Sequence, residues 1–177
     1  MSIWNKPLKG MTQKKLSHIQ SVISIMITVF ILFILTHTFF IAVVPTLSMY
    51  PTLSENEFVL GVKTEDIDYG DVVTFYTSDD HSQMWIKRLI GKPGDAIEIF
   101  NGYVMRNGTI LDEPYIYEAP NYDMDQFLVP DGTYFVMGDN RNNSADSHVI
   151  GPIDADAMVG KMIFHFNLFD RSEGDIA

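Results

Sequence analysis

The chain has 177 residues, 46% of them hydrophobic and none of them cysteine. This length allows one soluble domain plus a membrane anchor, and the lack of cysteine excludes disulfides, thiolate catalysis and cysteine-ligated metals. All 23 acidic residues follow Ser54, and with only eight of the 12 basic residues they give that part a formal charge of −15, so we expect no nucleic-acid partner.

An apolar run extends from Ile19 to Val44. As a helix that rises about 1.5 Å per residue, it is long enough to span the roughly 30 Å hydrocarbon core of a bilayer. A cleaved secretory signal peptide is the alternative, but its apolar region has only about 7–15 residues before a small-residue cleavage site. We therefore predict a retained transmembrane anchor over residues 19–44, with the lipid bilayer as a partner.

The orientation of this anchor follows from the lysines around it. Four lysines precede the apolar run and none follows it closely. By the positive-inside rule, we expect residues 1–18 to be cytoplasmic and residues 45–177 to be extracytoplasmic. The chain is thus predicted to be a single-pass protein of the cell membrane.

Residues 45–177 are predicted to form a mainly β domain with an antiparallel sheet. Asn-Gly pairs at 101–102 and 107–108 indicate two tight hairpins, hence a three-stranded meander over 97–111. The polar stretch 113–130 is expected to be a long loop, and residues 154–158 one helical turn. The remaining predicted strands are runs of β-branched and aromatic residues bounded by turn residues, at 57–62, 71–77, 84–90, 133–137 and 159–168.

Ser48 is the first candidate nucleophile. It lies a few residues after the apolar run, between Pro45 and Pro51, which stiffen the backbone on both sides. Its neighbours Leu47 and Met49 are apolar, as expected for a substrate groove close to lipid.

Lys87 is the first candidate base, because it interrupts an apolar predicted strand. The strand period of two places it on one face with Trp85 and Leu89. Burial among such neighbours lowers the pKa of a lysine, and only a neutral lysine can accept a proton from a serine hydroxyl. The alternative is an edge-strand charge that extends to solvent.

A polar segment from Gly138 to His148 follows the predicted strand 133–137, and nine of its eleven residues are polar or charged. By itself this pattern is also typical of a solvated loop with Asp and Asn turns. The chain lacks phosphate-binding glycine loops, HExxH and EF-hand spacings. Its five histidines are scattered, so we predict neither a metal site nor a cofactor.

The anchor and the three segments, in this order, resemble the type I signal peptidases (SPase I, peptidase family S26), which are membrane-bound serine peptidases. Ser48–Leu53 resembles the family's S-M-x-P-T-L box, and Lys87–Asp95 resembles its K-R box, which ends in G-x-P-G-D. Gly138–Ser147 resembles G-D-N-x-x-x-S-x-D-S. The short chain is similar to the compact Gram-positive form. The joint match favours a catalytic Lys87 over an edge-strand charge.

The resemblance implies a serine endopeptidase that removes N-terminal signal peptides from exported pre-proteins after small-x-small residues. It implies a catalytic dyad of Ser48 as nucleophile and Lys87 as general base. Support is expected from Thr46 as a second oxyanion donor, from Ser144 as a hydrogen-bond partner that orients the lysine, and from Asp139 and Asp146 as braces. Substrate-pocket walls are assigned to Met49 and Ile86.

One position departs from the family pattern. Relatives commonly carry Arg after the D-S pair, where this chain has His148. Because a histidine is only fractionally charged near neutral pH, its ion pair with Asp146 should be weaker, and we expect His148→Arg not to reduce activity.

Two other functions are compatible with parts of the pattern. A catalytically silent homologue would act as a membrane-anchored assembly partner or chaperone, which the presence of both Ser48 and Lys87 disfavours. A Ser/Lys self-cleaving repressor would need a DNA-binding N-terminus, where this chain has an apolar run.

Overall fold

The computed structural model describes residues 12–77 and 83–167, and the chain divides into two compact units, Met1–Thr38 and Phe39–Ala177. In the first unit, helix α1 (Gln13–Thr38) is long and apolar enough to cross a membrane. Its polar side chains bond to carbonyls one turn earlier, as when Thr28 Oγ1 donates to Ser24 O at 3.0 Å. Residues 1–11 of the predicted cytoplasmic segment 1–18 lie outside the described residues.

Helix α1 ends before the apolar run does. The next five residues form strand β1 (Phe39–Val43), which pairs antiparallel with β2 (Phe58–Lys63). The predicted anchor extended to Val44, so the structure divides that run between a helix and a sheet. Phe39–Val43 consists of aromatic, β-branched and small residues, which suit a strand as well as an apolar helix. A short apolar stretch does not distinguish the two by periodicity.

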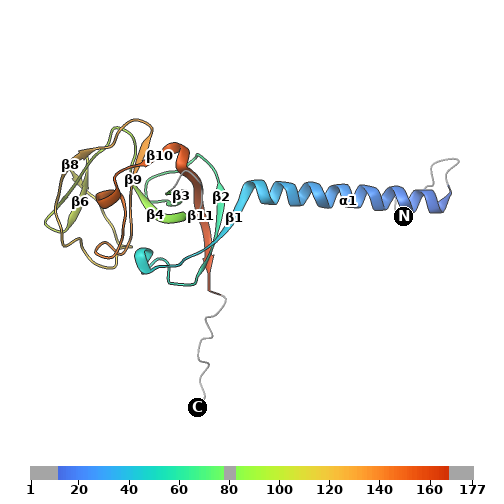
Figure 1. Ribbon diagram of the computed structural model, residues 1–177, viewed down its shortest axis with the longest axis horizontal. Helices are drawn as coiled ribbons and strands as arrows, with labels where there is room; N and C mark the ends of the chain where they lie inside the picture. Colours follow the sequence, from blue (N-terminus) through green and yellow to red (C-terminus); the bar gives the residue numbers. More distant parts are fainter. Residues whose placement is uncertain (1–11, 78–82, 168–177) are drawn as a thin grey trace, which may run out of the picture. The chain divides into compact units, whose positions relative to one another are not determined.

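The second unit is mainly β, which confirms the predicted fold class (Figure 1). Its larger sheet curls through seven antiparallel strands in the order β1-β2-β11-β3-β4-β9-β10. The strands besides β1 and β2 are β3 (Val72–Tyr76), β4 (Met84–Gly91), β9 (Thr133–Met137), β10 (Ile153–Asp154) and β11 (Met158–Phe166).

A smaller sheet, in the order β7-β6-β5-β8, lies at the end of the domain away from β1 and β2 (Figure 1). Strands β5 (Ala96–Phe100), β6 (Tyr103–Arg106) and β7 (Thr109–Ile110) form the predicted meander. Both Asn-Gly turns have positive φ at each residue, 50° and 80° at 101–102 and 54° and 76° at 107–108, as type I′ turns require.

Strand β8 (Met124–Leu128) corrects the prediction of a long irregular loop over 113–130. It pairs with β5, with Phe127 opposite Ile97, and the side chains of Met124 and Phe127 pack against the core of the small sheet. These two residues are three positions apart because the pairing with β5 shifts register between Ile97 and Ile99, so the sequence lacks the strict alternation that indicates a strand.

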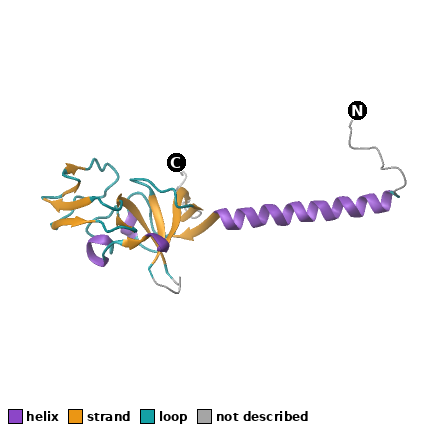
Figure 2. Cartoon of the chain, turned by 90° about the horizontal axis from the view of Figure 1, so that it is seen from above, coloured by secondary structure: helices purple, strands orange, loops and turns teal. Residues whose placement is uncertain are grey.

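Short helical turns join the strands (Figure 2). They are the 3-10 turns η2 (Leu47–Met49) and η3 (Ala155–Ala157) and the four-residue helix α2 (Ser147–Ile150). The turn predicted at 154–158 corresponds to η3. Turn η2 carries Ser48, and α2 closes the polar segment that begins at Gly138.

Strand β4 is the centre of the core. Its Ile86, Leu89 and Ile90 belong to three different clusters of buried apolar side chains. Two cationic residues, Lys87 and Arg88, are buried in the same strand, with only 4% and 9% of their surface exposed. Because buried cations need specific partners, the groups around them define the candidate site.

Candidate active site

The turn η2 holds Ser48 between two anchored neighbours. Met49 is buried in one apolar cluster together with Leu53, and the Leu53 N–H donates to Met49 O at 2.9 Å. Asn140 fixes the turn from the other side, because its backbone N–H donates to Ser48 O and its Nδ2 to Leu47 O, both at 3.1 Å. The Ser48 side chain is therefore presented by a backbone that two parts of the domain hold in place.

Lys87 reaches Ser48 from β4. Its Nζ lies 2.8 Å from Ser48 Oγ and 3.0 Å from Ile86 O, and 5.5 Å from the centre of the Trp85 ring. Burial lowers the pKa of the Lys87 ammonium to about 8, although the carboxylates of Asp146 and Asp139 oppose this by favouring the charged form. A strongly perturbed lysine in contact with a serine hydroxyl is a physical indication of a functional site.

Thr46 lies at the start of η2 with an exposed side chain. Its Oγ1 donates to Ser48 Oγ at 3.3 Å. The hydroxyl is thus next to Ser48 Oγ, on the side where the chain enters the turn.

A cavity of about 490 Å³ opens beside Ser48 and Lys87. It is bounded by η2 and the residues before it, by the start of β4 and by part of the polar segment. Both residues predicted as pocket walls, Met49 and Ile86, line it. Its other lining residues are Val44, Pro45, Thr46, Leu47, Met84, Trp85, Asn142, Asn143, Ser144 and Ala145.

Ser144 lines this cavity without the predicted hydrogen bond to Lys87. Its Oγ is buried and has no hydrogen-bond partner within 12–77 and 83–167, and Lys87 is held by Ser48 and the Ile86 carbonyl instead. The sequence predicted the right neighbourhood for Ser144 but not its bonding.

Asp146 organises the polar segment from within. Its carboxylate accepts the Gly138 N–H at 2.8 Å, and it caps α2 by accepting the His148 N–H at 3.3 Å. His148 Nδ1 lies 2.5 Å from Asp146 Oδ1, and its ring stacks on Tyr122 at 4.2 Å. The carboxylate is fully buried, so these contacts replace its hydration.

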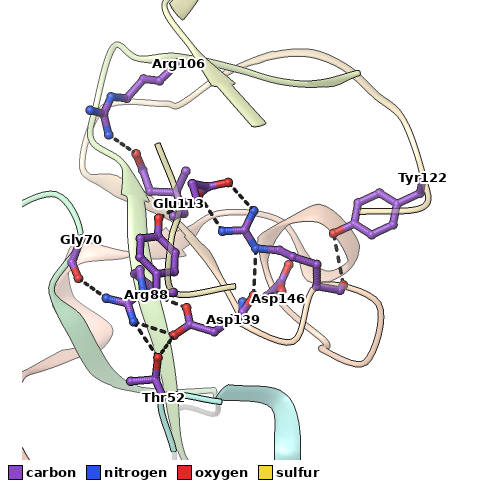
Figure 3. Close-up of polar contacts among 12 residues, drawn as sticks. Thr52, Gly70, Arg88, Arg106, Glu113, Tyr122, Asp139 and Asp146 are labelled. Carbon is purple, nitrogen blue, oxygen red and sulfur yellow. Dashed lines mark hydrogen bonds and ion pairs between the residues drawn. The ribbon is translucent and has the colours of Figure 1, made fainter. Parts of the chain in front are cut away.

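Asp139 binds the strand that carries Lys87 (Figure 3). Arg88 donates to it through Nε at 2.8 Å and through NH2 at 2.5 Å. The same arginine donates through NH1 to Gly70 O at 2.7 Å and lies over the Tyr115 ring at 3.9 Å. Thr52 Oγ1 also donates to Asp139 and accepts from Arg88. This pair thus ties the polar segment to β4 next to Lys87.

A second buried ion pair joins Arg141 to Glu113 through two hydrogen bonds of 2.7 and 2.8 Å (Figure 3). Arg141 Nε also donates to Gly138 O at 3.0 Å. Tyr115 OH donates to Glu113 at 2.8 Å, and burial, with the adjacent Glu113 carboxylate, raises the pKa of this phenol. The stretch that follows β7 therefore supports the segment that carries Asp139 and Asp146.

Sequence reasoning missed Thr52, Arg88, Glu113, Tyr115 and Arg141 as parts of this site. A signal existed for Arg88, which is a second cation within an apolar strand and therefore requires a buried anion. The sequence carries no such signal for Glu113 and Tyr115, because a polar stretch rich in proline indicates only a loop.

The chain is similar to several known proteins. The family model "Signal peptidase, peptidase S26" matches residues 17–167. The chain is 39% identical to a probable signal peptidase I-1 of Synechocystis sp. over 70% of this chain and 68% of that protein. It is 36% identical to signal peptidase IB of Staphylococcus aureus over 67% of this chain and 73% of that protein.

A plant protein and a crystal structure are also similar. The chain is 33% identical to thylakoidal processing peptidase 1 of Arabidopsis thaliana over 70% of this chain and 40% of that protein. The crystal structure of a signal peptidase I from Enterococcus faecalis covers 55% of this chain and 97% of that one, with 30% identity and a TM-score of 0.47. The match over residues 17–167 and the identities of 39% and 36% to the Synechocystis and Staphylococcus aureus proteins show that the chain belongs to the signal peptidase family, peptidase S26, a family of serine endopeptidases.

Proposed function

We propose that the chain is a membrane-anchored signal peptidase that works through a dyad of Ser48 and Lys87. The observation that carries the proposal is the 2.8 Å contact between Lys87 Nζ and Ser48 Oγ, made by a buried lysine. With its pKa lowered to about 8, this lysine is neutral in a useful fraction of molecules near neutral pH, as a general base must be.

In the first step, neutral Lys87 takes the proton of the Ser48 hydroxyl while Oγ attacks the scissile carbonyl carbon. The carbonyl oxygen becomes an oxyanion, for which the Ser48 backbone N–H and the Thr46 hydroxyl are the proposed donors. Each donor of this kind typically contributes about 10²–10³ in rate. Thr46 Oγ1, 3.3 Å from Ser48 Oγ, is close enough to turn to an oxygen formed there.

In the second step, the tetrahedral intermediate collapses and the C–N bond breaks. The Lys87 ammonium gives its proton to the departing amine, which leaves as the new N-terminus of the exported protein. Neutral Lys87 then activates a water molecule that hydrolyses the ester on Ser48. Buried Asp139 and Asp146 act by holding the polar segment through their hydrogen bonds.

The cavity supports an extended peptide as substrate. Strand β9 pairs with β4 only from Arg88 onward, so the stretch 84–87 has no ladder partner on that side within the described part of the chain. An extended peptide can add to such an edge through main-chain hydrogen bonds, with pockets for alternate side chains. We propose that cavity walls such as Met49 and Ile86 select small residues before the cleaved bond.

Helix α1 supports the proposed location in the cell membrane. It has 26 residues and no acidic residue in its first turn, and Ser48 follows its last residue, Thr38, by ten positions. A nucleophile so close in sequence to a membrane span suits substrates whose apolar segments also end at the bilayer surface. We propose a cytoplasmic N-terminus and an extracytoplasmic catalytic domain.

The test is a pre-protein cleavage assay with the purified full chain in detergent micelles. We expect cleavage after a small-x-small sequence, and a loss of roughly 10³-fold or more in Ser48→Ala and in Lys87→Ala. Lys161→Ala is the matched control, since Lys161 binds Asp71 at 2.9 Å outside the cavity and should keep normal activity.

Near-normal cleavage by either dyad variant would refute the dyad. No cleavage by the wild-type protein, with folding intact, would support the silent assembly partner instead. Replacing the small residues of the substrate by large ones tests the specificity separately, and cleavage at an unchanged rate would contradict it.

A further inference from the structure

Thr52 lies in the loop between η2 and β2. It is outside the cavity and away from the reacting atoms. Its hydroxyl nevertheless makes two hydrogen bonds into the site (Figure 3). Oγ1 donates to Asp139 Oδ2, and it accepts from Arg88 NH2 at 3.1 Å. A single hydroxyl thus uses both its donor and an acceptor position on groups of a buried ion pair.

Those two bonds connect the three segments of the site. Thr52 follows the turn that carries Ser48, Arg88 follows Lys87 in β4, and Asp139 begins the polar segment that leads to Asp146. The turn and β4 are also joined by the contact between Ser48 and Lys87, but that contact must change as the proton moves. The bond between Thr52 and Arg88 can hold the distance between the two segments throughout the reaction.

Removing only the hydroxyl isolates this connection. A valine at position 52 has nearly the same shape as threonine, and the two Arg88–Asp139 bonds of 2.8 and 2.5 Å do not involve Thr52. The base strand and the polar segment would stay joined. The turn with Ser48 would remain tied through the Asn140 contacts to its backbone and to β4 through the contact between Ser48 and Lys87. It would lose the bond to Arg88, which does not have to change during the reaction.

We propose that Thr52 is a positioning residue, whose hydroxyl holds the turn with Ser48 in register with the strand that carries Lys87. This inference rests on the proposed Ser/Lys function and adds a residue that touches neither substrate nor reacting atoms. A displacement of about 1 Å between reacting groups can cost roughly 10²-fold in rate. Thr52→Val should therefore lower kcat by about 10- to 100-fold and leave KM close to normal, because the cavity walls are unchanged.

The experiment measures kcat and KM of the full chain in detergent micelles, with a fluorogenic peptide that carries a small-x-small cleavage site. Rates are expressed per folded molecule, from thermal unfolding of each variant. Thr52→Ser keeps the hydroxyl and should recover most of kcat. If Thr52→Val does not fold, Thr52→Ser against Thr52→Ala gives the same comparison, since that pair also differs only in the hydroxyl.

Thr74→Val is the matched control. Thr74 is a buried threonine of β3 whose hydroxyl donates to Gly160 O at 3.4 Å, so its loss should reduce stability without reducing kcat of the folded enzyme.

The inference is overturned if Thr52→Val keeps kcat within about twofold of wild type, if Thr52→Ser fails to recover kcat, or if Thr74→Val loses as much kcat as Thr52→Val. If wild type itself does not cleave the peptide, the proposed function fails, and this inference fails with it. If wild type cleaves, Ser48→Ala does not, and Thr52→Val cleaves normally, only the role of Thr52 is wrong.

Discussion

Lys87 combines burial with a hydroxyl partner, and this sets the pH at which the proposed dyad can work. Because its pKa is lowered to about 8, about one molecule in ten carries the neutral base at pH 7, and most carry it above pH 9. We expect kcat/KM to rise about tenfold per pH unit below pH 8 and to level off above it. The measurement is a pH profile on the fluorogenic peptide. A limb centred near 6.5 would instead indicate a histidine as the base.

The same shift makes a prediction for stability. Below pH 8 Lys87 is protonated in both the folded and the unfolded state, and above its ordinary pKa of 10.5 it is neutral in both. Between these values the unfolded state binds the extra proton, so the contribution of Lys87 to the free energy of unfolding rises with pH. Denaturant titrations of wild type and Lys87→Met should diverge across this window, with wild type gaining. Parallel curves would show that Lys87 is not buried as described.

Substitution of His148 tests how much the charge beside Asp146 affects activity. The imidazole contacts the Asp146 carboxylate and stacks on Tyr122, and an arginine can also pair with a carboxylate and stack on an aromatic ring. An arginine would carry a permanent positive charge beside Asp146, so it would offset the Asp146 carboxylate, which raises the pKa of Lys87. We expect His148→Arg to keep activity and to move the acid limb of kcat/KM to lower pH. A large loss of activity would show that the histidine has a role of its own.

Among the elements, the polar segment approaches the turn with Ser48 so closely that Gly138 is required. A Cβ on Gly138 would lie only 2.5 Å from Ser48 O and would also overlap the Ser144 side chain. We expect Gly138→Ala to lower the free energy of unfolding by about 1–3 kcal/mol and to reduce kcat by about 10²-fold, because the backbone under the nucleophile must move. Denaturant unfolding measures the loss of stability, and the peptide assay measures the loss of kcat.

The variant Gly91→Ala separates the loss of stability from the loss of kcat. A Cβ there would press on the flexible end of Ile97, at 2.9 Å, and on Phe135, far from the turn with Ser48. This variant should lose stability and keep the kcat of the folded enzyme. If Gly138→Ala loses no more kcat than Gly91→Ala, the close approach of Gly138 to Ser48 has no catalytic importance.

The strands were predictable where local chemistry determines them. Asn101-Gly102 and Asn107-Gly108 adopt the positive φ angles that their hairpins need, and the run that became β4 is buried on both faces. The end of α1 at Thr38 was not predictable, because Phe39–Val43 is apolar either way and only its pairing with β2 makes it a strand.

For the site, the sequence predicted the central pair of residues but not the contacts that support them. Ser48 and Lys87, 39 positions apart, are within 2.8 Å, as the family resemblance implied. The supporting contacts depend on pairings between distant segments, such as Glu113 with Arg141 and Tyr115 with Arg88. Nothing local marks which buried anion meets which buried cation, so only the fold identifies these partners.

At the scale of the whole molecule, charge and hydrophobicity are separated along the chain. Residues after position 54 carry a formal charge of −15, which anionic headgroups repel, whereas α1 is apolar over membrane-spanning length. We therefore expect the proposed attachment of the domain to a bilayer to depend on the helix rather than on surface charge. The four lysines that precede residue 19, two of them in the first turn of α1, favour the proposed cytoplasmic N-terminus.

This orientation can be measured directly, because the chain has no cysteine of its own. We expect a membrane-impermeant maleimide to label Asp131→Cys in intact cells, since Asp131 is an exposed residue of the catalytic domain. Gln13→Cys, at the exposed first residue of α1, should be labelled only after permeabilisation. The cysteine-free wild type controls for other labelled proteins. Labelling of Gln13→Cys alone in intact cells would invert the topology and would place Ser48 on the wrong side to meet exported pre-proteins.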